Sequence, residues 1–278
     1  MHGSDLMQHT DAVLLDIDGV LSVGGRPVEG AGEALAFLQD KKIPFRCISN
    51  TTRQPRRAIA DRLGAMGLAI PEAHIFTPAV AAAALLAGRT LTRCMLLVWD
   101  DTLQDFEAAG IESAIGNVDA VVVGDAGGRM TYHAMNRAFR CILGGAPLIA
   151  LEKDRYWKDS DGLSLSAGPF VTALEYATGT DAELVGKPST AFFARALEAL
   201  GTAPERTLMV GDDIHTDIGG AQAAGIRGVL VRTGKYQNDL VGDAGVAPYA
   251  IIDSVADLPG LIGREPGCAG STALSPFL

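Results

Sequence analysis

Short apolar runs alternate with longer amphipathic stretches along most of this chain, and this alternation limits the folds that it can adopt. Strands that alternate with helices of about 10–15 residues are typical of βαβ units, in which right-handed crossovers join parallel strands. Strands are expected at residues 12–16, 45–49, 95–99, 120–124, 148–151, 207–210 and 229–232. Helices are expected at residues 31–41, 56–66, 80–87, 103–109, 132–143, 190–200 and 214–224. The sequence therefore predicts an α/β fold built on a parallel sheet.

Two proline-containing segments mark the points where the chain is expected to pass between domains. They are Thr77-Pro78 and Gly186-Lys187-Pro188, and a proline after a polar residue interrupts regular structure. The roughly one hundred residues between them have their own strand–helix alternation, which is enough for a second domain. We expect one domain made of residues 1–78 and 183–265, an α/β domain inserted at 79–182, and a tail at 266–278.

Composition excludes several classes of protein. Hydrophobic residues make up 48% of the chain, which is typical of a folded globular protein, and no apolar run approaches the roughly 20 residues that span a bilayer. The net charge of −10 comes without a basic cluster, which argues against nucleic acid as a partner. The first residues lack the pattern of a signal peptide, so the expected location is cytoplasmic, with no membrane partner. The four cysteines form no C-x-x-C pair, and three of them lie in apolar stretches where small buried residues are expected.

Two carboxylates, Asp16 and Asp18, directly follow the apolar run at residues 12–15. Residues i and i+2 of extended chain face the same way, so both acids could address one site at the carboxyl end of a buried strand. Gly19 allows a sharp exit from the strand. Such a pair indicates a metal ion and a nucleophile beside a proton donor, because a buried strand does not otherwise tolerate two ionised acids. The alternative is that these aspartates only shape a turn or cap a helix.

Polar residues also follow three other predicted strands. Ser49 and Asn50 could hold a phosphate through side-chain and backbone donors, or this segment could cap the helix that starts near Pro55. Lys187 follows an apolar run and precedes a proline, so a partly buried ammonium with a carboxylate or phosphate partner is expected, unless this lysine is simply solvated.

Three acids follow the strand at residues 207–210. They are Asp212, Asp213 and Asp217, and oxygen ligands of this kind suit Mg²⁺. The alternative is that Asp212 or Asp213 caps the following helix, and both roles can hold at once. Taken together, the four segments predict a carboxylate nucleophile whose charge, and that of a bound phosphate, is neutralised by a metal ion and a lysine.

The order and spacing of these segments resemble the haloacid dehalogenase superfamily of phosphohydrolases, in the subgroup with a large α/β cap. Asp16-Ile17-Asp18-Gly19-Val20-Leu21 resembles the first motif, Ser49-Asn50 the second, Lys187 the third, and Gly211-Asp212-Asp213 with Asp217 the fourth. The resemblance covers roughly residues 11–262. Further segments resemble the branch of phospholysine, phosphohistidine and inorganic pyrophosphate phosphatases and its haloacid-dehalogenase-like domain relatives. They are residues 132–136, 155–158, 168–176 and 232–236.

The resemblance implies a Rossmann-like parallel-sheet core with an inserted α/β cap, and a role for each motif. Asp16 attacks phosphorus, and Asp18 protonates the leaving oxygen and then activates water. Mg²⁺ is held by the Asp16 carboxylate, the Asp18 carbonyl and Asp212, with Asp213 or Asp217 acting through water. Ser49, the region of Asn50, and Lys187 hold the phosphoryl oxygens. The implied activity is hydrolysis of small phosphate esters, phosphoramidates or pyrophosphate, and Asp18 favours phosphoryl transfer over dehalogenation.

The inserted domain at 79–182 is then expected to cover the site and exclude water. Tyr156 and Lys158 are the candidates for substrate contact there, although an exposed loop anchored by Trp157 is an equal alternative. His133 and His215 are not needed as proton shuttles, because Asp18 fills that role. A phosphotransferase with the same intermediate and a receiver-like phospho-acceptor module are the alternative functions, and two copies could associate through the cap.

Overall fold

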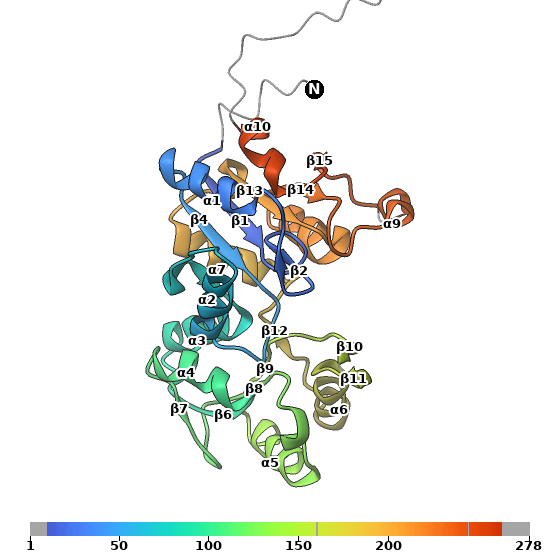
Figure 1. Cartoon of the computed structure of the whole chain (residues 1–278). Coiled ribbons are helices and arrows are strands. Elements are labelled where there is room, and N and C mark those ends of the chain that lie inside the picture. The colour runs from blue at the N-terminus through green and yellow to red at the C-terminus, as the bar shows by residue number, and fades with distance from the viewer. Residues whose placement is uncertain (1–9, 160, 244, 263–278) are drawn as a thin grey trace, which may run out of the picture.

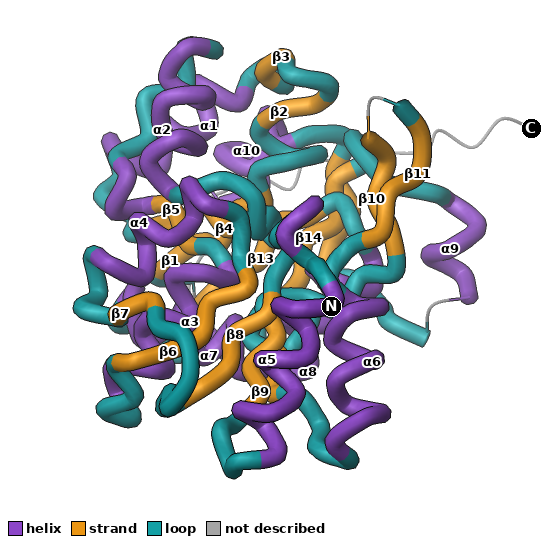
Figure 2. The backbone as a smooth tube through the Cα atoms, turned by 90° about the horizontal axis from the view of Figure 1, so that it is seen from below, coloured by secondary structure: helices purple, strands orange, loops and turns teal. Residues whose placement is uncertain are grey.

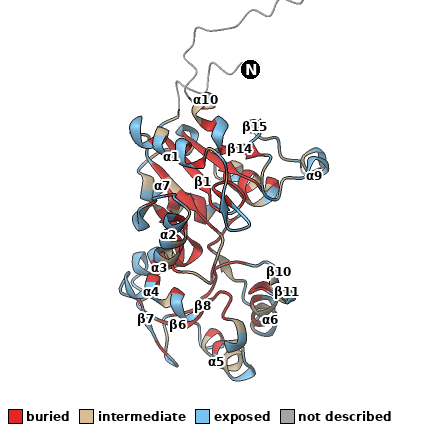
Figure 3. Cartoon of the chain, viewed as in Figure 1, coloured by how far each residue is buried: buried red, intermediate tan, exposed pale blue. Residues whose placement is uncertain are grey.

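The first of two parallel sheets contains the strand that precedes Asp16. A computed structural model describes residues 10–159, 161–243 and 245–262. In it, six parallel strands lie in the order β15-β14-β13-β1-β4-β5, in the upper half of Figure 1. They are β1 (Ala12–Asp16), β4 (Phe45–Ile48), β5 (Ile75–Phe76), β13 (Thr207–Gly211), β14 (Arg227–Val231) and β15 (Ala250–Ile252). β1 lies in the middle of the sheet and is buried along its whole length (Figure 3).

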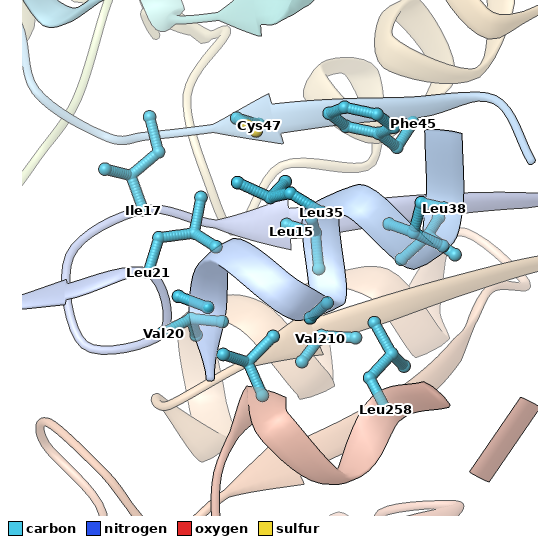
Figure 4. Close-up of a cluster of buried hydrophobic side chains, with 14 of the residues drawn as sticks. Leu15, Ile17, Val20, Leu21, Leu35, Leu38, Phe45, Cys47, Val210 and Leu258 are labelled. Carbon is cyan, nitrogen blue, oxygen red and sulfur yellow. The ribbon is translucent and has the colours of Figure 1, made fainter. Parts of the chain in front are cut away.

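Alternate residues of β1 point to opposite faces of this sheet, and a layer of helices covers each face. Leu15 packs with Leu35, Leu38 and Leu258 on one face (Figure 4), and Leu14 packs with two phenylalanines of α7 on the other. The first face is covered by α1 (Ala31–Asp40), α2 (Arg56–Ala65) and α10 (Leu258–Ile262), and the second by α7 (Thr190–Leu200) and α8 (Gly220–Ala223). Because both faces are covered, the strand is apolar throughout until its last residue.

The second sheet has five parallel strands in the order β12-β9-β8-β6-β7. Figure 2, which looks from below, shows β6, β8 and β9 running side by side. The strands are β6 (Arg93–Leu97), β7 (Glu112–Ser113), β8 (Ala120–Val123), β9 (Leu148–Ala150) and β12 (Glu183–Leu184). One face packs on α3 (Pro78–Gly88) and α4 (Leu103–Glu107), the other on α5 (Tyr132–Leu143) and α6 (Gly168–Thr178). An antiparallel hairpin of β10 (Tyr156–Asp159) and β11 (Gly162–Leu165) joins β9 to α6.

The remaining elements are short. They are the β2 (Ser22–Val23) and β3 (Arg26–Pro27) hairpin, α9 (Asn238–Asp243), the 3₁₀ turns Glu72–His74, Asp100–Thr102, Gly127–Arg129, Pro204–Arg206 and Val255–Asp257, and a π-helix at Ile214–Gly219. In the part of the chain that the structure describes, no helix is long and apolar enough to cross a membrane.

The predicted fold class, a parallel-sheet core with an inserted α/β domain, is confirmed. The second sheet extends to β12 at 183–184, which places its last strand just past the predicted domain boundary at 182. The helix expected at 214–224 is instead a π-helix followed by the short α8. Cys47 and Cys94 are buried free thiols and Cys141 is half-buried, whereas Cys268 and the predicted tail at 266–278 lie outside the described residues.

Candidate active site

Asp16 is the last residue of β1, and Asp18 lies in the turn that follows. Asp16 is buried. The turn closes when the N–H groups of Leu21 and Ser22 donate to the Ile17 carbonyl. Asp18 is exposed, and one of its carboxylate oxygens lies 3.3 Å from Nη1 of Arg62, on α2. The two acids therefore occupy different environments at one strand end.

The polar segment after β4 lines the cavity and also holds the backbone of Lys187 in place. Ser49 is buried and faces the cavity that Asp16 lines. Asn50 also lines that cavity, and its amide binds both backbone groups of Lys187: Oδ1 accepts the N–H at 2.9 Å and Nδ2 donates to the carbonyl at 3.3 Å. Pro55 at the start of α2 makes no side-chain cap hydrogen bond, and the first N–H of the helix, that of Arg56, donates at 3.2 Å to Asp105 Oδ2 and not to Ser49 or Asn50. The capping alternative for this segment is therefore not what the structure shows.

Lys187 bridges two carboxylates in the interior. Its ammonium lies 2.5 Å from Asp16 Oδ1 and 2.7 Å from Asp217 Oδ1, and its side chain is only 4% exposed. Burial alone would lower the pKa of Lys187, but the charges of Asp16 and Asp217 outweigh burial and raise it. The lysine is therefore a fixed positive charge beside the proposed nucleophile, not a solvated surface residue.

The π-helix explains how Asp217 reaches this cluster. Its Ile218 N–H donates to the Asp213 carbonyl five residues back, and this wide turn is typical of functional sites. Asp217 Oδ2 accepts the N–H groups of Asp212 and Asp213. A Cβ at Gly211 would lie 2.3 Å from that of Asp217, so only glycine fits there.

Asp213 caps the following helix, whereas Asp212 is a buried acid at the site, so each of the two roles expected for this segment is found at a different residue. The Asp213 carboxylate accepts the N–H groups of His215 and Thr216, so it caps the π-helix. The hydrogen bonds from Thr216 and His215 hold the pKa of Asp213 below its usual range despite partial burial. Asp212 is buried, and burial raises its pKa to about 6 although it accepts the Lys235 N–H.

Three carboxylates form a group that could hold a metal ion. Asp16, Asp212 and Asp217 each offer an oxygen, and these oxygens lie within 4.8 Å of one another. Within the described residues, the ammonium of Lys187 is the one that contacts this group, so two negative charges are in excess when all three carboxylates are ionised. Burial raises the pKa of Asp16 well above its usual range, with Lys187 opposing. An all-oxygen donor set with uncompensated negative charge fits a hard divalent cation, and it includes Asp217, which we expected to act through water.

A glycine-containing loop after β14 lies against this group. Thr233 Oγ1 donates to the Gly19 carbonyl at 2.5 Å. Gly234 has a φ of +66°, and a Cβ there would lie 2.1 Å from Asp212 Oδ2. Sequence reasoning noted this loop only as part of the family resemblance. The signal that could have found it is a polar, glycine-containing segment at the end of one more parallel strand.

The second domain closes the cavity from the opposite side. The cavity holds about 720 Å³, and its wall from this domain is formed by Lys153, Asp154, Arg155, Tyr156 and Trp157. Tyr156 thus lies where we expected it, whereas Lys158 is exposed and lies outside the cavity wall that the described residues form. His133 and His215 are exposed and lie outside the same wall. Residues 153–155 follow β9, so their position also obeys the strand-end rule that identified the core residues.

Two family descriptions match the chain. "Haloacid dehalogenase-like hydrolase" matches residues 13–112, and the HAD-hydrolase-like description matches residues 184–258. Haloacid dehalogenase-like hydrolase domain-containing protein 2 from Bos taurus is 46% identical over 87% of this chain and 92% of its own length. The human phospholysine phosphohistidine inorganic pyrophosphate phosphatase is 38% identical over 90% of this chain and 93% of its own length.

Solved structures of phosphatases superpose on most of this chain. The p-nitrophenyl phosphatase from Archaeoglobus fulgidus superposes with a TM-score of 0.84 at 26% identity, covering 90% of this chain and 98% of that one. NagD from E. coli K-12 superposes with a TM-score of 0.83 at 28% identity, with the same coverage. The chain therefore belongs to the haloacid dehalogenase-like hydrolases, and the inserted domain is the cap of that fold. Within the family it is a phosphatase.

Proposed function

We propose that the protein is a Mg²⁺-dependent phosphatase that hydrolyses small phosphate esters, phosphoramidates or pyrophosphate through an aspartyl-phosphate. The observation that carries the proposal is the buried cluster of Asp16, Asp212 and Asp217 around Lys187, with Asp18 beside it. A buried carboxylate with excess negative charge around it is a poor nucleophile toward an anionic phosphate. A divalent cation held by the three carboxylates would supply the missing positive charge for both.

The chain's own residues then divide the chemistry. Asp16 attacks phosphorus, the bond from phosphorus to the leaving oxygen breaks, and Asp18 gives its proton to that oxygen. Asp18 next accepts a proton from water as this water attacks phosphorus, which releases phosphate and restores the Asp16 carboxylate. Lys187 balances charge throughout. Ser49, buried in the cavity wall, is placed to donate to a phosphoryl oxygen.

The test is hydrolysis of p-nitrophenyl phosphate in the presence of Mg²⁺ and after EDTA has removed Mg²⁺. We expect sustained turnover with Mg²⁺ and none without it, and recovery when Mg²⁺ is added back. Borohydride added during turnover should reduce an acyl phosphate at residue 16 to homoserine, which peptide mass spectrometry detects. Turnover without homoserine would contradict the covalent step. A single burst of p-nitrophenol, equal to the amount of protein, would instead support a receiver-like module. Transfer of the phosphoryl group to an added alcohol would support a phosphotransferase.

The substrate is proposed from the relatives alone. One relative is named for phospholysine, phosphohistidine and inorganic pyrophosphate, and one solved structure for p-nitrophenyl phosphate. A panel of phosphorylated metabolites, with these compounds included, would rank the candidates by kcat/KM. Association of two copies through the cap stays a prediction.

A further inference from the structure

The loop that follows the phosphate-binding segment Ser49-Asn50 is bonded to the cap. Thr102 of the cap donates from Oγ1 to the Thr52 carbonyl at 3.0 Å, and the Asp125 N–H donates to Thr52 Oγ1 at 3.3 Å. Thr52 and Thr102 are both buried. The cap is therefore attached to the core at this loop as well as through the two connecting segments of chain.

Arg53, the next residue of that core loop, inserts between the two tryptophans of the protein. Its guanidinium carbon lies 4.7 Å from the centre of the Trp99 ring and 4.3 Å from that of Trp157, and both rings belong to the cap. Nε and Nη2 bind the two oxygens of Asp125 at 2.8 and 3.3 Å. Asp125 is buried and also accepts the Gly127 N–H at 2.9 Å. A guanidinium combines stacking and two-point binding of a carboxylate in a way that lysine does not.

These contacts hold three separate cap segments on one core side chain. Trp99 follows β6, Asp125 follows β8, and Trp157 lies in β10. Trp157 lines the catalytic cavity and an adjoining cavity of about 480 Å³, and Asp18 lines both cavities as well. Because Asp18 is the proposed proton donor to the leaving oxygen, the leaving group must lie near it. The Trp157 ring is then part of the wall that the leaving group meets.

We propose that Arg53 is a positioning residue that fixes the Trp157 hairpin over the active site, and that the leaving group of a good substrate places a flat, apolar surface on Trp157. The kinetic part of this inference rests on the proposed phosphatase activity. The structural part does not, because it concerns only the contacts of Arg53 with Trp99 and Trp157. An aromatic ring held rigidly by its neighbours prefers an offset-stacked or edge-on aromatic partner. The kcat/KM for aryl phosphates should therefore be higher than that for acyl phosphates of similar reactivity.

The structural part is tested by tryptophan fluorescence, because the sequence has two tryptophans and Arg53 contacts both. In Arg53→Ala the emission should shift to the red as the rings gain water, with Arg53→Lys between this variant and the wild type. Arg57→Ala, at an exposed arginine near the start of α2, the helix that follows the Arg53 loop, is the matched control and should leave emission unchanged. Thermal melts show whether each variant is folded. An emission spectrum of folded Arg53→Ala equal to that of Arg57→Ala overturns the proposal.

The kinetic part compares p-nitrophenyl phosphate with acetyl phosphate, whose leaving group is too small to cover Trp157. For Arg53→Ala we expect kcat/KM to fall about tenfold for the aryl substrate, mainly through KM, and less than about threefold for acetyl phosphate. Arg53→Lys should restore part of the loss. An equal loss for both substrates overturns the assignment of Trp157 to the leaving group. If the wild type hydrolyses neither substrate, the proposed function fails, and the fluorescence result still decides the role of Arg53.

Discussion

Replacing Lys187 with methionine tests whether its ammonium is what makes the carboxylate cluster tolerable. The ammonium lies 2.5 Å from Asp16 and 2.7 Å from Asp217, with its side chain 4% exposed. Methionine keeps the apolar bulk and removes the charge, so the carboxylate group of Asp16, Asp212 and Asp217 loses the ammonium that contacts it. Removing one partner of a buried ion pair costs about 3–5 kcal/mol. Since Lys187 serves two carboxylates, we expect the upper end of this range.

The assay is thermal unfolding with EDTA and with saturating Mg²⁺. For a chain of this size about 1 kcal/mol corresponds to about 2–4 °C in Tm, so Lys187→Met should unfold about 10–20 °C below wild type in EDTA. Mg²⁺ should raise the Tm of the variant more than that of wild type, because the cation replaces the lost positive charge and binds only the folded state. Lys41→Met, at an exposed lysine, is the control and should unfold with wild type in both conditions.

Equal thermal stability of Lys187→Met and the wild type would contradict the role given to the Lys187 charge. If Lys187→Met and wild type had the same Tm in EDTA, the buried acids would be neutralised by their own protons, and the lysine would contribute no net charge stabilisation. A variant whose Tm falls in EDTA but does not respond to Mg²⁺ would support the stabilising role of the Lys187 ion pairs. The same result would contradict the proposal that the three carboxylates bind a cation.

Three other substitutions test different parts of the site. Asp16→Asn should lower turnover by a factor on the order of 10⁴ or more, yet raise the Tm of the metal-free protein, because burial disfavours the charged form of Asp16; a Tm below that of wild type would contradict this. Gly234→Ala should weaken Mg²⁺ binding in a calorimetric titration by about tenfold or more, because its Cβ would lie 2.1 Å from Asp212 Oδ2. Gly179→Ala is the control, since Gly179 has a similar φ and a Cβ there would meet only open space. Glu152→Gln should lower the free energy of unfolding in urea by about 1–3 kcal/mol, because the buried carboxylate accepts three hydrogen bonds at the base of the cap hairpin and an amide can accept at only one of its two positions. An unchanged urea midpoint would show that the hairpin does not depend on these bonds.

Most of the core site could be predicted from the sequence because parallel strands end at a common edge. Asp16 ends β1, and Ser49 and Asp212 directly follow β4 and β13. The apolar run of each strand is visible in the sequence, and the ends of the three strands are neighbours in the sheet. Lys187 joins them from the return connection out of the cap. Asp217 shows where this rule stops. Helical periodicity of 3.6 residues cannot reveal a π-helix, and it is the wide turn that brings this carboxylate to Lys187.

The cap contacts could not be predicted, and the reason is physical. Arg53 and Asp125 are separated by 72 residues, and neither lies in a pattern of spacing or hydrophobicity that would pair them. The other partners of Arg53 are two aromatic rings that the sequence alone would place equally well in the hydrophobic core. The proposed chemistry uses residues whose positions follow from strand ends, whereas the proposed contact with the leaving group uses a cap wall that Arg53 holds through its contacts with Trp99, Asp125 and Trp157. A relative could therefore keep every catalytic residue and differ in substrate through changes at Arg53, Asp125 or Trp157 alone.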